Sequence, residues 1–253
     1  MRSIPAEPAA AGLGSVPFDE FELTGRARTH VRQYGQTPGE PPGQPRFAAR
    51  PEVAAAFLAL RAEAARDGID MLPIASWRPF EAQARNWNRK FSGQATLYDC
   101  QGRARDYGTL APPDIVRAIL NWTGLPGATR RHWGTDIDVF DRAAHPPGYR
   151  TALLPDEAGP DGVYARLHAW LDAHAERFGF FRPYRTRRRG MCPAPWHLSY
   201  APSAEAALTA IDIDMVACAV RGSDLLGREL VLDMLPDIFR DHVLDVDGPM
   251  TAG

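Results

Sequence analysis

Thr129-Arg-Arg-His-Trp-Gly-Thr-Asp-Ile-Asp-Val-Phe-Asp141 is the stretch that decides the fold. In its second half, acidic and apolar residues alternate, which is the pattern of a β-strand with two different faces. Ile137 and Val139 point to one face and predict a buried side, whereas Asp136 and Asp138 point to the other. The stretch therefore predicts a strand that carries two carboxylates on a single polar face.

Helical patterns surround this strand on both sides. The spacing of apolar residues predicts helices over residues 51–67, 79–91, 112–120, 162–178, 203–219 and 223–242. Short apolar runs predict two further strands, over residues 72–76 and 196–200, and a loop over residues 92–110. Residues 18–34 are compatible with a short helix or a strand. Because helices and strands mix without regular alternation, the sequence predicts an α+β fold rather than a doubly wound sheet.

The composition is that of an ordinary globular protein. Of the 253 residues, 45% are hydrophobic and 24% are charged, which excludes a disordered or fibrous chain. The net charge of −2 gives no reason to expect nucleic acid or an anionic membrane as a partner. No apolar run approaches the roughly 18–20 residues of a membrane helix, so no membrane span is expected.

The cysteines and the N-terminus bear on the cellular compartment. Cys100, Cys192 and Cys218 are odd in number, widely spaced and without a CxxC pair, so they predict neither a disulfide framework nor a thiolate zinc site. A reducing compartment is the simplest expectation. The residues after Met1 contain no apolar core of an export signal, which predicts a cytoplasmic protein unless export information is missing.

Three stretches carry residues suited to chemistry. In Ser76-Trp-Arg-Pro-Phe-Glu-Ala-Gln83, Arg78 fits a clamp for a carboxylate or a partner in a surface ion pair. The stretch with the alternating strand combines one histidine with three aspartates, which suits zinc ligation or a capped turn with a solvated strand face. In Pro195-Trp-His-Leu-Ser-Tyr200, His197 lies between large aromatic residues. It is either a metal ligand or a core residue whose ring nitrogens are hydrogen-bonded.

Together the three stretches resemble the zinc D-alanyl-D-alanine carboxypeptidases of the VanY type. The shared motifs are Ser-x-Arg-(x4)-Gln, Gly-Thr-Asp-Ile-Asp and Pro-Trp-His-Leu-Ser-Tyr, in the order of the family. The resemblance implies the fold of the Hedgehog signalling domain, a small antiparallel sheet flanked by helices. It also implies action near the D-alanine end of peptidoglycan stem peptides in bacteria.

The resemblance assigns expected roles to individual residues. In the family, zinc is held by a histidine, an aspartate and a second histidine, and a glutamate three residues before the second histidine is the general base. Asp138 matches the aspartate ligand and His197 the second histidine. Arg78 matches the substrate-binding arginine, Gln83 the motif glutamine, and Thr129 stands where the motif has serine.

Two positions depart from the pattern of the family. Arg131 stands at the place of the first histidine, and its guanidinium cannot bind a metal because it stays protonated and has no acceptor. Ala194 stands at the place of the glutamate, so a general base typically worth about 10²–10⁴-fold in rate is lost. We expect Arg131 to pair with Asp138 in place of the metal. His132 as the ligand and Asp136 as the base are the nearest substitutes.

These observations predict a catalytically impaired family member, a pseudoenzyme that keeps the cleft for a stem peptide ending in D-Ala and acts in binding or regulation. Zinc is expected from the family, although the departures argue against its occupancy. The first alternative is an active zinc carboxypeptidase with a substitute ligand and a substitute base. The second alternative is a purely structural protein that has no function in the cleft. The expected organisation is an N-terminal segment with a Pro/Gly-rich linker over 1–45, a peptidase-like domain over 46–202 and a helical C-terminal extension over 203–253 packed on the core.

Two further features leave alternatives open. The arginine-rich loop, residues 182–190, contains five arginines and either attracts an acidic substrate or is simply solvated. The C-terminal extension has an apolar face formed by Leu225, Leu226, Leu230 and Leu235. This face either docks on the core or forms a dimer contact, and the sequence does not decide the oligomeric state.

Overall fold

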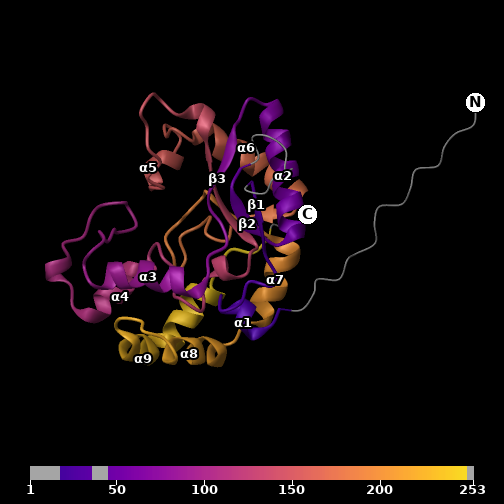
Figure 1. Ribbon diagram of the computed structural model, residues 1–253. Helices are drawn as coiled ribbons and strands as arrows, with labels where there is room; N and C mark the ends of the chain where they lie inside the picture. The colour runs from indigo at the N-terminus through magenta and orange to yellow at the C-terminus, as the bar shows by residue number, and fades with distance from the viewer. Residues whose placement is uncertain (1–17, 36–44, 250–253) are drawn as a thin grey trace, which may run out of the picture.

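A four-stranded antiparallel sheet lies at the centre of the computed structural model, which describes residues 18–35 and 45–249 (Figure 1). Its strands lie in the order β3-β4-β6-β5. Their bounds are Met71–Ala75 for β3, Asp136–Asp141 for β4, His197–Tyr200 for β6 and Phe180–Phe181 for β5. The predicted α+β class with a small antiparallel sheet is confirmed.

The register of β4 and β6 gathers polar side chains on one face. Asp136 lies opposite Ser199, and Asp138 lies opposite His197. Residues directly opposite each other in an antiparallel pair project to the same face. The alternating apolar residues of both strands are buried in the core on the other face. The predicted strand with one apolar and one polar face is therefore confirmed.

Two helices and a small ribbon cover the apolar face of the sheet. The helices are α2 (Pro51–Arg66) and α6 (Ala165–His174), and the antiparallel ribbon joins β1 (Arg32–Tyr34) to β2 (Phe47–Ala49) (Figure 1). Pro51 begins α2 at a position where the missing N–H group costs no hydrogen bond. This layer and the sheet enclose the first hydrophobic core.

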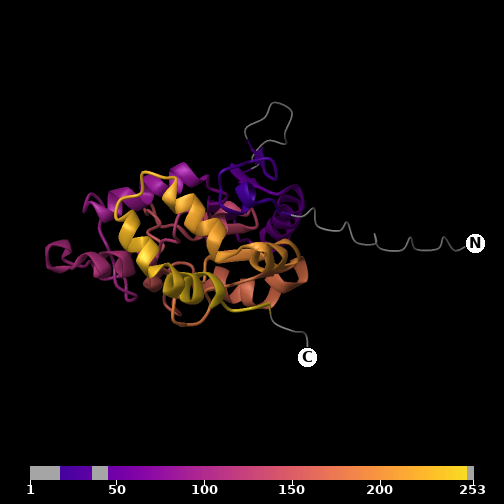
Figure 2. The ribbon, with the colours of Figure 1, turned by 90° about the horizontal axis from the view of Figure 1, so that it is seen from below.

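A second hydrophobic core lies among the remaining helices. Its members come from α3 (Phe80–Phe91), α4 (Pro112–Leu120), α7 (Ala201–Ala210), α8 (Ile213–Arg221), α9 (Arg228–Ile238) and the π-helical turn Phe239–Leu244. Figures 1 and 2 both show α8 and α9 against α3 and α4, although they are far apart in the sequence. The C-terminal residues up to 249 therefore belong to the folded body.

Several short elements complete the described chain. They are α1 (Glu20–Leu23), α5 (Pro155–Ala158) and the 3-10 turns Tyr107–Thr109, Arg130–His132, Arg142–Ala144 and Ala175–Phe178. Thus residues 18–34 contain both a helix and a strand, and the segment 92–110 holds a 3-10 turn. Within the described ranges, no helix combines the length and the apolar character needed to cross a membrane.

The helix predicted over residues 203–219 is in fact two helices. Helix α7 ends at Ala210, and Asp212 caps α8 by accepting a hydrogen bond from the Met215 N–H at 2.8 Å. An aspartate that accepts such a bond satisfies an otherwise unpaired backbone donor at a helix start. The apolar periodicity continues across this break, which is why the pattern alone did not reveal it.

The prediction about the cysteines is wrong. Cys100 and Cys192 form a disulfide across 92 residues, with their Cα atoms 5.3 Å apart. Sequence spacing identifies compact disulfide frameworks, but it carries no signal for two distant loops that the fold brings together. Cys218 stays free and exposed. The expectation of a reducing compartment therefore loses the observation on which it rested.

The apolar face of the C-terminal extension docks on the core. Leu225 and Leu235 are buried, and Leu230 packs against the same cluster. Leu226 is the exception, because 44% of its surface is exposed and its backbone C=O instead accepts a hydrogen bond from Trp87. Docking on the core is therefore the alternative that the structure supports for three of the four leucines.

Candidate functional site

A cleft of about 410 Å³ opens beside the polar face of the sheet. Seven of the residues singled out in the sequence lie in its walls: Arg78, Gln83, Thr129, Arg131, Asp138, Ala194 and His197. The fold thus brings three distant stretches of the chain together at one place. The other two candidates, His132 and Asp136, do not line the cleft.

His197 lies between the two aspartates of the neighbouring strand. Its Nε2 is 2.8 Å from Asp136 Oδ1, and its Nδ1 is 2.8 Å from Asp138 Oδ1. The second contact is an ion-pair contact and not a hydrogen bond, since Asp138 Oδ1 accepts no hydrogen bond from any residue that the structure describes. Burial opposes a charge on the imidazole, yet the two carboxylates raise the pKa of His197. The arrangement favours an imidazolium ion between two carboxylates.

Arg131 fills the other side of Asp138. Its Nη2 donates a hydrogen bond to Asp138 Oδ2, so the expected ion pair is confirmed. The side chain of Asp138 is only 3% exposed. Burial alone would raise the pKa of this carboxyl group, but the charges of Arg131 and His197 hold it below its usual range. Asp138 is therefore an ionised carboxylate with Arg131 on one side and the imidazole of His197 on the other.

Asp136 is held beneath His197 by a second arginine. Arg130 Nε is 3.0 Å from Asp136 Oδ1, and Arg130 Nη2 donates to Ser199 Oγ at 2.7 Å. The guanidinium also lies 4.7 Å from the centre of the Trp133 ring. Although burial raises the pKa of Asp136, Arg130 and His197 lower it to about 2. A carboxylate so strongly engaged is poorly suited to act as a substitute base.

His132 lies in the core rather than at the cleft. Its Nδ1 donates to the Arg78 C=O at 2.7 Å, and its Nε2 accepts from the Gly127 N–H at 3.0 Å. Burial lowers the pKa of His132 to about 4, so the ring is neutral. Its own C=O accepts from Trp77 Nε1 at 2.9 Å. Neither ring nitrogen is therefore free for a metal beside Asp138, and the structure gives no support to the alternative of His132 as a substitute ligand.

Arg78, just before α3, and Gln83, on α3, line the cleft together. Arg78 Nη1 donates to Gln83 Oε1 at 2.7 Å, and Gln83 Nε2 donates to the Gly124 C=O at 2.6 Å. Burial, together with the charge of Arg131, lowers the pKa of Arg78 to about 10, so it is a cation at neutral pH. The remaining guanidinium donors suit a carboxylate ligand.

Ala194 offers no proton acceptor at the place of the expected base. Its side chain packs with Tyr184 and Trp196, and its N–H donates to the Tyr184 C=O at 2.8 Å. The Tyr184 ring meets His197 edge-on at 4.9 Å, and burial raises the pKa of Tyr184 to about 12. Of the described residues that line the cleft, Asp138 is the sole carboxylate.

The donor set of the cleft does not fit a zinc ion. A catalytic zinc site uses about three protein ligands and keeps one position open for water. Asp138 and His197 are two donors, and the third position belongs to a guanidinium that already donates to Asp138. Within residues 18–35 and 45–249, no group of three or more His, Cys, Asp or Glu side chains is arranged so that it could hold a metal ion.

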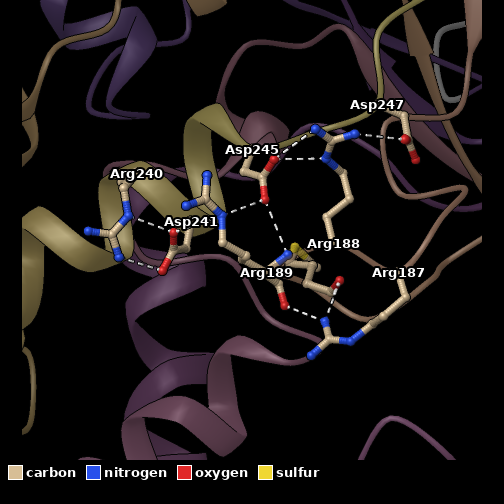
Figure 3. A network of polar contacts seen from close by, with 9 residues as sticks. Arg187, Arg188, Arg189, Arg240, Asp241, Asp245 and Asp247 are labelled. Carbon is tan, nitrogen blue, oxygen red and sulfur yellow. Dashed lines mark hydrogen bonds and ion pairs between the residues drawn. The ribbon is translucent and has the colours of Figure 1, made fainter.

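The arginine-rich loop forms ion pairs with the C-terminal segment, residues 241–247 (Figure 3). Arg188 is 2.8 Å from Asp245 and 3.3 Å from Asp247, and Arg189 is 3.2 Å from Asp245 and 3.5 Å from Asp241. Figure 3 shows these aspartates facing the loop from the C-terminal side. The structure therefore supports neither a freely solvated loop nor one whose arginines all point towards a substrate.

Two features of the cleft had no strong signal in the sequence. The disulfide of Cys192 fixes the segment before Ala194 to the loop after α3, near the stacked rings of Trp122 and Trp196. Lys90 also lines the cleft. Its spacing of seven residues from Gln83, two helical turns, was the available signal that both share one face of α3.

The fold and the site define an α+β domain of the peptidase type, with an Asp–His pair across two central strands beside a cleft. The family model for VanY, described as D-alanyl-D-alanine carboxypeptidase, matches residues 46–203, and the chain belongs to this family. The resemblance noted in the sequence is thereby confirmed.

The chain is also similar to the following proteins and solved structures. One uncharacterized protein of Haemophilus influenzae is 30% identical over 122 residues, which are 47% of this chain and 93% of the relative. A second uncharacterized protein from the same organism is 33% identical over 103 residues, which are 41% of this chain and 67% of the relative. VanYB in complex with D-Alanine-D-Alanine gives a TM-score of 0.46 at 20% identity, covering 64% of this chain and 75% of VanYB. The structure of the LdcB LD-carboxypeptidase gives a TM-score of 0.40 at 17% identity, covering 66% of this chain and 74% of LdcB.

Proposed function

We propose that this chain is a catalytically impaired member of the VanY family that binds peptidoglycan stem peptides ending in D-Ala. The observation that carries the proposal is the ion pair of Arg131 with Asp138. It puts a fixed positive charge beside the carboxylate that a metal would need. A cation bound there would meet repulsion from the guanidinium and would have two ligands instead of three.

The lost base supports the same proposal. Hydrolysis needs a group that removes a proton from the attacking water, and an alanine methyl group cannot do so. Asp136 is buried below His197 and is engaged by Arg130, so it does not supply this function from the cleft. The loss of a ligand and the loss of the base affect separate steps, and one substitute would not restore both.

Peptide binding is supported by the residues that remain. Arg78 offers guanidinium donors to a C-terminal carboxylate, and Gln83 holds it in place. The apolar walls of the cleft include the stacked rings of Trp122 and Trp196, with ring centres 6.0 Å apart. A related structure, VanYB, is described with D-Alanine-D-Alanine bound, which supports this class of ligand.

The alternative of an active zinc peptidase requires a substitute ligand and a substitute base. Both nitrogens of His132 are used in the core, and Asp136 does not line the cleft. The described structure therefore favours the impaired member. We also propose that residues 46–202 are the peptidase-like unit and that the extension from residue 203 supports one wall of its cleft.

The decisive experiment compares the wild-type chain with the double variant Arg131→His/Ala194→Glu. Both proteins are purified without added metal, and we measure bound zinc, release of D-Ala from N-acetyl-D-Ala-D-Ala and calorimetric binding of that peptide. We expect the wild type to bind the peptide, to hold little zinc and to release no D-Ala. The double variant should gain zinc and chelator-sensitive release. Chelator-sensitive D-Ala release by the wild type would overturn the proposal.

A further inference from the structure

Lys90 lies in the cleft, outside the motifs that identify the family. Helix α3 carries Gln83, Asn86 and Lys90 on the face that lines the cleft. Lys90 Nζ donates to Thr123 Oγ1 at 2.5 Å. Burial, together with the charge of Arg78, lowers the pKa of Lys90 to about 8, so the ammonium group is still protonated at neutral pH. A second cation thus lies near Arg78 inside the same cleft.

The positive charges of the cleft are not balanced by its own residues. Arg131 is paired with Asp138, which is the one carboxylate among the described residues in the cleft wall. Neither Arg78 nor Lys90 forms an ion pair with a carboxylate in the part of the chain that the structure describes, although the charge of Asp138 acts on Arg78 from a distance. Keeping two unpaired cations partly out of water is unfavourable, and the cost disappears when an anion binds.

Both cations have donors left for a ligand. An ammonium group has three N–H donors, and Thr123 accepts from one of those of Lys90. Arg78 has five donors, and Gln83 accepts from one of them. Arg78 lies two residues before the start of α3, and Lys90 lies in its last turn. One carboxylate therefore does not exhaust the cationic donors of the cleft.

We propose that Lys90 forms a second carboxylate site, so that the cleft selects short peptides with two carboxylates, one held by Arg78 and one by Lys90. This inference rests on the proposed peptide-binding function and specifies its ligand class. Lys90 is then a specificity-determining residue, because it distinguishes a dianionic peptide from a monoanionic one of the same shape.

The test uses pairs of peptides that differ in one charge. N-acetyl-D-Ala-D-Glu is compared with N-acetyl-D-Ala-D-Gln, which places the second carboxylate at the C-terminal residue. N-succinyl-D-Ala-D-Ala is compared with its succinamyl analogue, which places it at the other end. N-acetyl-D-Ala-D-Ala serves as the monoanionic reference. Dissociation constants from calorimetry give a charge-selectivity ratio for each pair, free of differences in shape.

We expect at least one pair to show a ratio of about 10 in the wild type, the size of a hydrogen bond to a charged group. In Lys90→Gln this ratio should fall to about one, and in Lys90→Arg it should persist. Arg89→Gln is the matched control, because it removes the same charge from the exposed side of α3 and should keep the wild-type ratio.

The outcomes separate this inference from the proposed function. If the wild type binds the reference peptide but both ratios are near one, the second carboxylate site is wrong while peptide binding stands. The same holds if a high ratio survives in Lys90→Gln. If the wild type binds none of the five peptides, the proposed function fails and the inference fails with it. Wild-type ratios near one overturn the inference without any variant, and a high ratio is assigned to Lys90 by its persistence in Lys90→Arg and its loss in Lys90→Gln.

Discussion

Arg131 and Asp138, seven residues apart in the chain, form an ion pair in the wall of the cleft, with the aspartate buried and the arginine partly buried. The pair gives the buried carboxylate of Asp138 a partner of opposite charge. A lone buried charge is costly, whereas a charge with a partner on each side is tolerated. Asp138 has Arg131 on one side and His197 on the other. Arg131, at the position where the family motif has histidine, therefore supplies one of the partners that Asp138 needs.

The ion pair predicts a large loss of stability when its cation is removed. In Arg131→Met, the carboxylate of Asp138 stays buried with His197 as its remaining partner, and we expect a loss of about 3 kcal/mol in the free energy of unfolding. Arg142→Met is the control, because Arg142 is 64% exposed in its pair with Asp70 and should contribute less than about 1 kcal/mol. Urea denaturation measures the free energy of unfolding of the wild type and of both variants. Equal losses in the two variants would contradict a compensating role for Arg131.

Two buried histidines predict opposite responses to the same substitution. His132 uses both ring nitrogens, whereas His168, 5% exposed on α6, has no hydrogen-bond partner for either nitrogen among the described residues. At pH 7, His132→Leu should therefore cost several times more unfolding free energy than His168→Leu. Removing a ring whose polar atoms are unpaired also removes their desolvation cost. A larger loss in His168→Leu than in His132→Leu would show that this contrast is wrong.

His168 also predicts a dependence of stability on acid. Burial, with a contribution from Arg182, lowers the pKa of His168 to about 4 from 6.5. The unfolded chain therefore binds more protons between these values, so the contribution of His168 is present above pH 6.5 and is lost as the pH falls towards 4. The loss from pH 7 to pH 5 is on the order of 2 kcal/mol. Denaturation curves should show His168→Leu losing less stability than the wild type over this interval, and parallel losses would contradict the assignment.

The sequence predicted the strand of Asp138 and the second strand with His197 because their alternation is local. The residues of the cleft could be grouped because the family motifs name them. The disulfide was not predictable, because it joins loops 92 residues apart and depends on tertiary packing. The core contacts of His132 were not predictable either, although adjacent side chains are expected to point apart. An adjacent residue on a 3-10 turn points elsewhere than Arg131, and only the surrounding contacts show that it faces the core.

The disulfide predicts that oxidation supports both stability and binding. Cys100 and Cys192 close a long loop, and we expect the double variant Cys100→Ser/Cys192→Ser to lose about 2–4 kcal/mol of unfolding free energy. Peptide affinity should also fall, because Met191, next to Cys192, lines the cleft. Cys218→Ser removes a free, exposed thiol and should change neither value. Unchanged stability and affinity in the double variant would exclude the disulfide as a support of the cleft wall.

The contact between the arginine-rich loop and the C-terminal segment predicts a steric effect at Gly190. A Cβ atom at Gly190 would lie 2.0 Å from the backbone oxygen of Asp241, so Gly190→Ala must push the loop and the segment apart. We expect a loss of about 1–3 kcal/mol in stability, the range for overpacked sites. Because the loop continues into Met191 and the cleft wall, affinity for N-acetyl-D-Ala-D-Ala should fall as well. Gly248→Ala is the matched control, since its Cβ would meet no atom within 4 Å. If both alanine variants bind the peptide as the wild type does, the C-terminal segment does not position the cleft.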